Sequence, residues 1–194
     1  MQTPVCKTDE YGDQSCYLNG KRHREDGPAI IRANGDQEWY LNGKIHREDG
    51  PAIICANGSQ RWYLNDKRHR EDGPAIIYAN GNQFWYLNDK LHREDGPAII
   101  GANGNQFWYL NGKRHREDGP AIILFNGYQE WYFEGRNVTE EWISRYQKLK
   151  KKHTFLGIPV RDKWVVRKIV MSWYDNPKFK CVRNRLKRDY LELY

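Results

Sequence analysis

The chain is poor in apolar residues for its length of 194. They make up 39% of it, the mean hydropathy is −0.96, and no apolar run approaches the roughly 20 residues of a transmembrane helix. The first residues also lack the apolar segment of a secretory signal peptide. We therefore expect a soluble protein that is not secreted.

Cysteine is scarce, and its spacing suggests no pairing. Cys6, Cys16, Cys55 and Cys181 contain no Cys-x-x-Cys motif. A few scattered cysteines are typical of a protein whose thiols stay reduced. We expect four reduced thiols and hence a reducing compartment such as the cytoplasm.

Motifs of three common enzyme classes are missing. The chain has no Gly-x-x-x-x-Gly-Lys phosphate-binding loop, no Gly-x-Ser-x-Gly nucleophile elbow and no His-Glu-x-x-His metal motif. The sequence indicates no cofactor and no small-molecule substrate. We expect a protein that is not an enzyme.

The chain is rich in aromatic residues and contains an internal repeat. The chain holds 8 Trp and 13 Tyr, which argues against disorder because disordered chains contain few aromatic residues. A 23-residue period gives five complete copies from Cys16 to Glu130, with a partial copy before them and another after them. The string His-Arg-Glu-Asp-Gly-Pro-Ala-Ile-Ile begins each repeated segment at His23, His46, His69, His92 and His115.

Each copy predicts a β-hairpin. In one copy, a β-prone Ala-Ile-Ile run and a Gln-x-Trp-Tyr-Leu run flank Asn57-Gly58, and such an Asn-Gly pair predicts a type I′ turn. That turn would place Ile53-Ile54 beside Arg61-Trp62. We predict a mainly β fold, an elongated antiparallel meander of hairpin repeats over residues 1–137, in a single sheet of ten or more strands. Its tryptophans would form one row, and its tyrosines would face the opposite side.

The His-Arg-Glu-Asp string contains a base, a cation and two carboxylates, a combination that suits catalysis or metal binding. It occurs five times unchanged, however, which is typical of a structural turn and not of an active site. We interpret the histidine as capping or filling the turn, and the aspartate as accepting backbone N–H groups before Gly. Histidines of successive units would lie about 10 Å apart, too far to share a metal ion.

Three positions of the unit vary strongly from copy to copy. They are free of the repeat's packing demands, so we expect them to be the most exposed positions and to carry any partner specificity; the alternative is tolerated drift. The first set is Arg32, Cys55, Tyr78, Gly101 and Leu124, the second is Glu38, Arg61, Phe84, Phe107 and Glu130, and the third is Arg22, Ile45, Arg68, Leu91 and Arg114.

Positive charge is concentrated at the C-terminal end. Residues 138–194 hold 15 Lys/Arg against 6 Asp/Glu, whereas residues 1–137 hold 17 against 19. Apolar residues at helical spacing predict a small, basic helical segment over 138–194 that caps the last repeats. Its basic side is a candidate contact for nucleic acid or an anionic membrane surface, and a solvated face is the alternative. The candidate contact residues are Lys150, Lys151, Lys152, Arg183, Arg185, Lys187 and Arg188.

Two strings carry a family resemblance. Asn-Gly-Lys-x-His-x-x-x-Gly-x-Ala and Ala-Asn-Gly-x-Gln-x-Trp-Tyr resemble a MORN repeat over residues 11–137, although Arg-Glu-Asp-Gly-Pro replaces the family's shorter Gly-x-Gly string. This variant is similar to repeats found in proteins of large DNA viruses. The resemblance implies a scaffold that binds other proteins and sometimes a membrane.

Three functions stay open. The first is a non-enzymatic scaffold for protein-protein interaction, such as a minor virion component, that contacts itself, capsid proteins or other proteins. The second is a nucleic-acid-associated protein acting through the basic C-terminal helices. The third is an antitoxin or immunity-type inhibitor. If the protein is viral, the virion is the alternative location to the cytoplasm.

Overall fold

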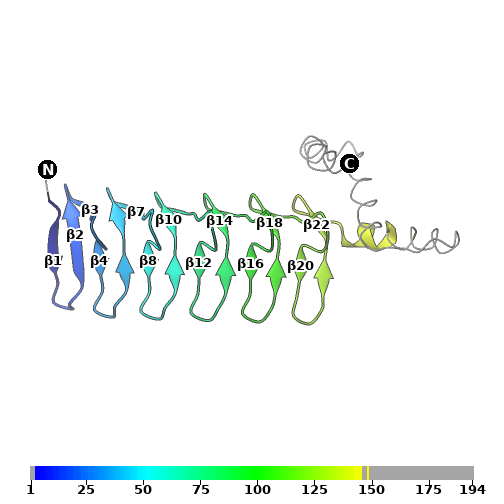
Figure 1. The fold of residues 1–194 in the computed structure, drawn as a ribbon, viewed down its shortest axis with the longest axis horizontal. Coiled ribbons are helices and arrows are strands. Elements are labelled where there is room, and N and C mark those ends of the chain that lie inside the picture. The colour runs from blue at the N-terminus through cyan, green and yellow to red at the C-terminus, as the bar shows by residue number, and fades with distance from the viewer. Residues whose placement is uncertain (1–2, 146–147, 149–194) are drawn as a thin grey trace.

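The computed structural model describes residues 3–145 and 148. These residues form a mainly β, antiparallel meander whose units lie side by side along one axis, followed by one short helix (Figure 1). The repeated 23-residue segments each form hairpins, and the predicted fold class is confirmed.

A long antiparallel sheet runs through all the units. It has 13 strands within the described residues, in the order β1-β2-β4-β5-β8-β9-β12-β13-β16-β17-β20-β21, with β3 paired to β2. The strands are β1 (Val5–Thr8), β2 (Gln14–Leu18), β3 (Lys21–Arg22), β4 (Ile30–Ile31), β5 (Gln37–Glu38), β8 (Ile53–Ile54), β9 (Gln60–Arg61), β12 (Ile76–Ile77), β13 (Gln83–Phe84), β16 (Ile99–Ile100), β17 (Gln106–Phe107), β20 (Ile122–Ile123) and β21 (Gln129–Glu130).

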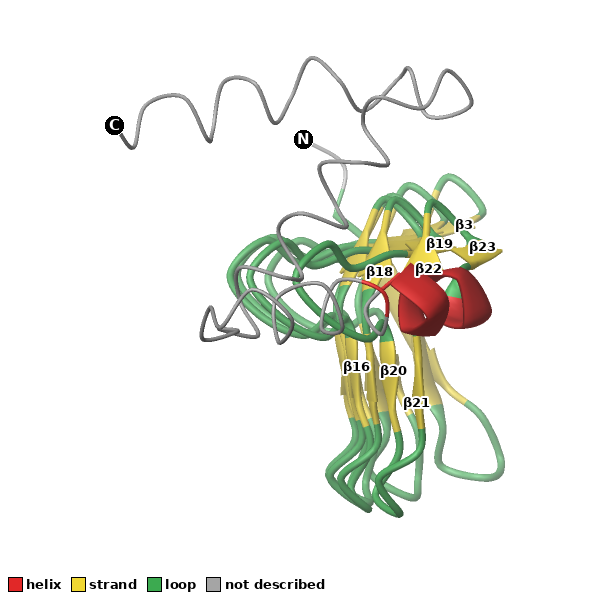
Figure 2. Cartoon of the chain, turned by 90° about the vertical axis from the view of Figure 1, so that its right-hand side faces the viewer, coloured by secondary structure: helices red, strands yellow, loops and turns green. Residues whose placement is uncertain are grey.

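Each unit also folds a second, smaller hairpin beside the long sheet. Viewed along the array, these small sheets lie on one side of the long strands, and wide loops project on the other (Figure 2). The sequence predicted a single sheet and did not separate these hairpins from it. The five pairs in the described residues are β6 (Tyr40–Leu41) with β7 (Lys44–Ile45), β10 (Tyr63–Leu64) with β11 (Lys67–Arg68), β14 (Tyr86–Leu87) with β15 (Lys90–Leu91), β18 (Tyr109–Leu110) with β19 (Lys113–Arg114), and β22 (Tyr132–Phe133) with β23 (Arg136–Asn137).

Tryptophan marks the point at which each unit leaves the long sheet for the small one. The backbone N–H of Trp39 donates to the carbonyl of Ala52 in the next unit, with 2.8 Å between N and O. The Trp39 carbonyl accepts from the N–H of His46, 3.1 Å away, within the small hairpin's own connection. The tryptophan N–H therefore bonds across the junction between units, and the tryptophan carbonyl bonds within its own unit. The chain thus passes from one sheet to the other with both backbone groups of the tryptophan paired.

The type I′ turn closes the small hairpin and not the long one. Asn42 and Gly43 have φ values of 52° and 85°, as the two central residues of that turn require. At Asn34-Gly35 only the glycine has positive φ, at 94°, and its N–H donates to the Arg32 carbonyl at 2.9 Å. That geometry is a type I turn followed by a glycine bulge. The type I′ turn predicted for the Ala-Asn-Gly segment was therefore wrong.

The bulge residue shifts the strand register by one position. Ile53 lies opposite Arg61, and Ile54 lies opposite Gln60. The predicted pairing of Ile53-Ile54 with Arg61-Trp62 assumed a two-residue loop. The loop has three residues, so the predicted register is wrong by one residue. The shift leaves Trp62 outside the strand pair, where its N–H reaches the carbonyl of Ala75.

Side chains at the tips of the long hairpins tie each unit to the next. The Asp36 carboxylate accepts the backbone N–H of Ala56 in the following unit, at 2.7 Å. Tyr128, at the last such position, has no following unit to bind and is 53% exposed. The acceptors are Asp13, Asp36, Ser59, Asn82 and Asn105, and the N–H donors are Ala33, Ala56, Ala79, Ala102 and Phe125.

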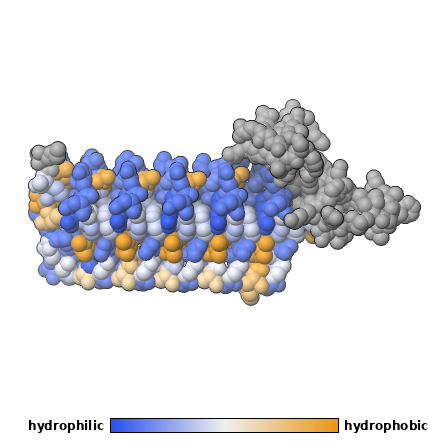
Figure 3. All heavy atoms as spheres, in the orientation of Figure 1, coloured by the Kyte–Doolittle hydropathy of each residue, from blue (hydrophilic) through white to orange (hydrophobic). Residues whose placement is uncertain are grey.

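The core is thin because a single layer of sheet has little interior. The alanine that precedes each Ile-Ile pair is fully buried, whereas the isoleucines range from buried to partly buried. Figure 3 shows the consequence on the surface, where small apolar patches recur from unit to unit along the array, with hydrophilic residues between them. A fold with so much surface per residue accounts for the low apolar content of the sequence.

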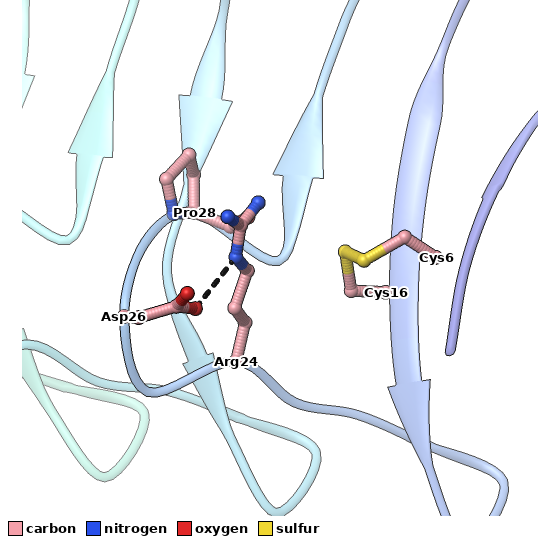
Figure 4. The surroundings of a disulfide bond; sticks show 5 residues. All are labelled: Cys6, Cys16, Arg24, Asp26 and Pro28. Carbon is pink, nitrogen blue, oxygen red and sulfur yellow. Dashed lines mark hydrogen bonds and ion pairs between the residues drawn. A yellow bond between two sulfur atoms is a disulfide. The ribbon is translucent and has the colours of Figure 1, made fainter. Parts of the chain in front are cut away.

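A disulfide bond closes the N-terminal edge of the long sheet. Cys6 on β1 and Cys16 on β2 lie directly opposite each other and are joined through their sulfurs (Figure 4). The expectation that all four cysteines are reduced thiols is wrong for this pair. Because all four residues of the edge strand β1 are exposed, the disulfide supplies an anchor that burial does not.

A helix closes the other end of the array. It begins at residue 139 and is described to 145. The N–H of Trp131 donates to the Thr139 hydroxyl at 2.9 Å, where earlier tryptophans reach the alanine carbonyl of a following unit. Trp142 is 9% exposed and stacks on Trp131, with 4.4 Å between ring centroids. The further helices predicted for the basic segment lie outside the described residues.

The two phenylalanines of the last unit have opposite environments. Phe133, which replaces the leucine of other copies, is fully buried. Phe125, which replaces the alanine of other copies, is 73% exposed among the described residues. It lies on the turn of the long hairpin, whereas the helix packs against Trp131 at the junction of the two sheets.

Candidate functional site

The repeated histidines brace one unit against the next. Nδ1 of His46 accepts the backbone N–H of Asn65, 3.2 Å away, in the type I′ turn of the following unit. Nε2 of the same ring faces the Glu48 carboxylate at 3.5 Å. All five histidines make the first contact, at 3.1–3.3 Å, with Asn42, Asn65, Asn88, Asn111 and Glu134. The histidine therefore caps a turn, as expected, but that turn belongs to the neighbouring unit.

The arginine that follows the histidine is held by three groups in the four units that have a tryptophan before it, whereas the first unit has Cys16 at the tryptophan position and lacks the ring contact. Arg47 lies over the Trp39 ring at 4.1 Å from its centroid, its Nε donates to Asp49 at 2.8 Å, and its Nη1 donates to the Pro51 carbonyl at 3.3 Å. The hydrogen bond from Arg47 lowers the pKa of Asp49. The aspartate was expected to accept backbone N–H groups, but the arginine occupies it instead. The equivalent Arg24 and Asp26 are shown in Figure 4.

These contacts show that the His-Arg-Glu-Asp string has a structural role, in holding its own loop and in bonding to the next unit. Its imidazole Nδ1, its guanidinium and its aspartate are each engaged by neighbouring groups in the repeat. Among residues 3–145 and 148, no group of three or more His, Cys, Asp or Glu side chains lies close enough to hold a metal ion. Any functional site within these residues is therefore expected in the parts of the unit that vary.

The two faces of the long sheet differ in how much they vary. On one face, directly opposed residues form a row that alternates isoleucine with glutamine, from Gln14 to Gln129. Neighbouring residues of a strand point to opposite faces, so the adjacent row lies on the other face. That row alternates isoleucine with Glu38, Arg61, Phe84, Phe107 and Glu130. We call the two surfaces the Ile/Gln face and the variable face.

Exposure does not explain this difference. In the central units, the glutamines of the Ile/Gln face and the residues opposite isoleucine on the variable face are all partly buried. Drift that followed exposure would therefore have altered both faces. The first set is Gln37, Gln60, Gln83 and Gln106, and the second is Glu38, Arg61, Phe84 and Phe107.

All three variable positions meet on the variable face, as the first unit shows. Arg32 donates to the Glu38 carboxylate at 2.8 Å, and the Tyr40 hydroxyl donates to the same carboxylate at 2.9 Å. The Arg22 guanidinium lies 5.4 Å from the centre of the Tyr40 ring. Burial raises the pKa of Tyr40, and the hydrogen bond to Glu38 raises it further. The repeated tyrosine is thus the fixed element around which the variable residues gather.

Aromatic residues and arginine occupy the middle of the variable face. The Tyr78 and Phe84 rings meet edge to face at 5.7 Å, and the Arg61 guanidinium lies 5.7 Å from the Tyr78 ring. Arg61 Nε is buried and has no hydrogen-bond partner among the described residues. One unit further on, Arg114 donates to the hydroxyl of Tyr109 at 3.1 Å.

The predicted specificity residues share one place in the unit, the first residue of the long hairpin's turn. Arg32, Tyr78 and their equivalents are partly buried, because they pack against the other variable residues. The expectation that they are the most exposed positions is therefore wrong. Cys55, a free thiol, is one of them, and the others are Gly101 and Leu124. The candidate contacts of the basic segment, from Lys150 to Arg188, lie outside the described residues.

The sequence prediction missed one contributor to this surface and did not bring the variable positions together. It treated Tyr40 and its equivalents as part of the constant scaffold, although their hydroxyls and rings contact the variable residues. It also examined the variable positions one at a time. The 23-residue alignment with alternate residues assigned to opposite faces would have placed positions 30, 32 and 38 together.

Comparisons with known proteins do not extend the description. No protein-family model matches the chain, and no curated protein matches it. Within the described residues, none of the helical structure is long and apolar enough to cross a membrane.

Proposed function

We propose that the chain is a non-enzymatic scaffold of the MORN-like type, which binds a protein partner through the variable face. The observation that carries the proposal is the contrast between the two cross-strand rows of the long sheet, of which only the row on the variable face changes from unit to unit. An extended repeat array offers a long contact surface, and differences between units give such a surface its specificity.

The nature of the face supports a protein partner. Aromatic residues and arginine are enriched at protein interfaces. Tyr78, Phe84, Phe107 and Arg61 supply both kinds of side chain in neighbouring units. The described tyrosine hydroxyls and arginines also offer hydrogen bonds around an apolar centre, the arrangement found in binding surfaces.

The disulfide bears on where such a scaffold would act. Disulfides persist in oxidising compartments and on virion surfaces, whereas the cytoplasm keeps thiols reduced. Of the two expected locations, the Cys6–Cys16 bond favours the virion. Detection of the disulfide-bonded chain in purified virions tests this location.

Site-specific photo-crosslinking tests the proposed function. A photoreactive amino acid is placed at position 84 on the variable face, or at position 83, the next residue of β13, on the Ile/Gln face. In extracts of the native source, we expect a discrete crosslinked complex from position 84 and none from position 83. Equal crosslinking from both positions, or none from position 84, contradicts the proposal.

Charge segregation supports a second candidate, nucleic-acid binding by the C-terminal segment. Residues 138–194 hold 15 Lys/Arg against 6 Asp/Glu. Such binding weakens steeply with salt, because each phosphate contact releases condensed counterions. A chain ending at residue 148, which keeps the Trp142 stack on Trp131 but removes all seven candidate contact residues, would lose this binding and keep the crosslink from position 84. Binding that survives the truncation excludes the segment as the binding site.

A further inference from the structure

The variable face carries an excess of positive charge. At its fifteen variable positions it has five arginines, Arg22, Arg32, Arg61, Arg68 and Arg114, against two acidic residues, Glu38 and Glu130. Two of the arginines have carboxylate partners: Arg32 pairs with Glu38 at 2.8 Å, and Arg68 pairs with Asp89 at 2.5 Å.

Arg61 and Arg114 have no carboxylate partner among the described residues. Arg61 stands over Tyr78, and its buried Nε donates to no described atom. Arg114 donates only to the Tyr109 and Tyr132 hydroxyls, at 3.1 and 3.3 Å. A partly buried guanidinium without an anion is unfavourable, and a carboxylate from a bound partner would supply the missing acceptor.

An apolar strip leads from Arg61 to the unit that contains Arg114. Ile76 lies opposite both Arg61 and Phe84, and Ile99 lies opposite both Phe84 and Phe107. The row therefore runs from Arg61 across Phe84 to Phe107, in the unit that leads into Arg114. With about 4.8 Å between strands, two units span roughly 20 Å, the length of about six extended residues.

We propose, building on the proposed function, that this strip binds a short, extended acidic segment of a partner protein. Its carboxylates pair with Arg61 and Arg114, and its apolar side chains pack on Phe84, Phe107 and Tyr78. The planar fork of arginine suits carboxylates, because it donates two parallel hydrogen bonds.

The ends of the variable face favour a peptide over a nucleic acid. Glu38 lies before the strip and Glu130 after it in the same cross-strand row. A long polyanion that followed the row would meet a carboxylate at each end, whereas a segment of about six residues ends before either.

Selection from a random octapeptide library displayed on phage, with the full chain as bait, tests the proposal. We expect enriched peptides with Asp or Glu on either side of apolar residues. In fluorescence anisotropy, a labelled selected peptide should bind at least tenfold more weakly to Arg61→Gln and to Arg114→Gln. Gln83→Ala, on the opposite face of β13, is the matched control and should bind as the unaltered chain does.

Several outcomes would overturn the inference. They are selected peptides without acidic residues, equal affinity for the arginine variants, or displacement of the peptide by single-stranded DNA with the same dependence on Arg61. Circular dichroism shows whether each variant is folded. If Arg61→Gln is not folded, Arg61→Lys replaces it, and we expect this variant to bind the peptide with reduced but measurable affinity. If the inference fails while the crosslink from position 84 persists, the proposed scaffold function stands with a partner of other chemistry.

Discussion

At the scale of single residues, the constant positions of the repeat are occupied by groups that act across the joints between units. His69 illustrates this, since its Nδ1 accepts the N–H of Asn88 in the next unit. A contact of this kind needs an acceptor at one point in space and no particular chemistry beyond that. The same reasoning applies to the oxygen acceptors at the hairpin tips, where aspartate, serine and asparagine all serve.

Replacing His69 tests its structural role. His69→Ala removes the acceptor for Asn88 and should lower the free energy of unfolding by about 1 kcal/mol, the typical net contribution of such a hydrogen bond. His69→Asn places an amide oxygen near the same point and should cost less. Urea titration followed by tryptophan fluorescence measures both. An unchanged stability for the alanine variant, or loss of a bound metal from it, would contradict the capping role.

The glycine of the Asp-Gly-Pro segment is required by a close approach and not by its backbone angles. A Cβ at Gly73 would lie 3.0 Å from Arg70 Cζ. Arg70 has little freedom to move aside, because the Trp62 ring, Asp72 and the Pro74 carbonyl hold it. Gly73→Ala should therefore destabilise the chain by about 1–3 kcal/mol.

A double mutant separates this clash from other effects of alanine. In an Arg70→Ala background the guanidinium is gone, so Gly73→Ala should cost much less than it does alone. Thermal unfolding of the four chains gives the coupling. Additive effects would show that the close approach to Arg70 is not the reason for glycine.

At the scale of elements, the terminal half-unit replaces a repeated pair with a covalent bond. Cys6 and Cys16 occupy the positions held by Ala29 and Trp39 in the first complete unit. Within residues 3–145 no unit packs against the outer side of β1, and the disulfide links β1 directly to β2.

Reduction should release the edge strand. With a sequence separation of 10 residues, the disulfide is expected to contribute roughly 2–3 kcal/mol through the unfolded state. Cys6→Ser/Cys16→Ser should raise hydrogen exchange in β1 and leave the central units unchanged. Cys55→Ser, which removes the free thiol, is the control. Equal exchange in β1 with and without the bond would show that pairing with β2 alone anchors the strand.

The hairpins were predictable from sequence, but their turn types were not. Asn34-Gly35 and Asn42-Gly43 are the same dipeptide, yet only the second pair has positive φ at both residues. The choice depends on how the flanking strands pair with neighbouring units, which is a tertiary property. The Cys6–Cys16 pairing was hidden for a related reason, since Cys6 lies in a degenerate half-copy whose register with the repeat is hard to see.

The convergence of variable positions was predictable only in part. The 23-residue period identified them, but their burial depends on Tyr40 and its equivalents folding against them from the small sheets. Because the small sheets were not separated from the long one, the sequence suggested exposed positions where the structure has packed ones.

At the scale of the whole molecule, carboxylates contribute to stability at many joints, and acid should weaken them together. The N–H of Ala56 lowers the pKa of Asp36, and the hydrogen bond from Arg70 lowers that of Asp72. Their stabilisation is therefore full above the ordinary aspartate pKa of about 3.9 and is lost as pH falls through the lower folded-state values. The melting temperature should be flat near neutral pH and fall below about pH 4. If the melting temperature begins to fall well above pH 4, groups other than these aspartates are responsible for the loss of stability.

The C-terminal closure of the array is testable by paired truncations. A chain ending at residue 148 keeps Thr139 and Trp142, whereas one ending at 137 exposes Trp131. We expect the shorter chain to melt at a lower temperature and to aggregate, because a stacked aromatic surface becomes exposed. Equal melting of the two monomeric chains would show that the helix contributes nothing to the closure.

The hairpin-tip acceptors also bear on how such an array changes length over generations. Duplication of an interior unit inserts a copy that offers an oxygen to its successor and an N–H to its predecessor, so both new joints are complete. Duplication of the last unit would instead place Tyr128 at an internal joint, where the other copies have Asp, Ser or Asn. Units can therefore be added by recombination inside the array without loss of the tip hydrogen bonds. A unit that carries tyrosine at this position lacks the acceptor for a following unit and suits only the C-terminal end.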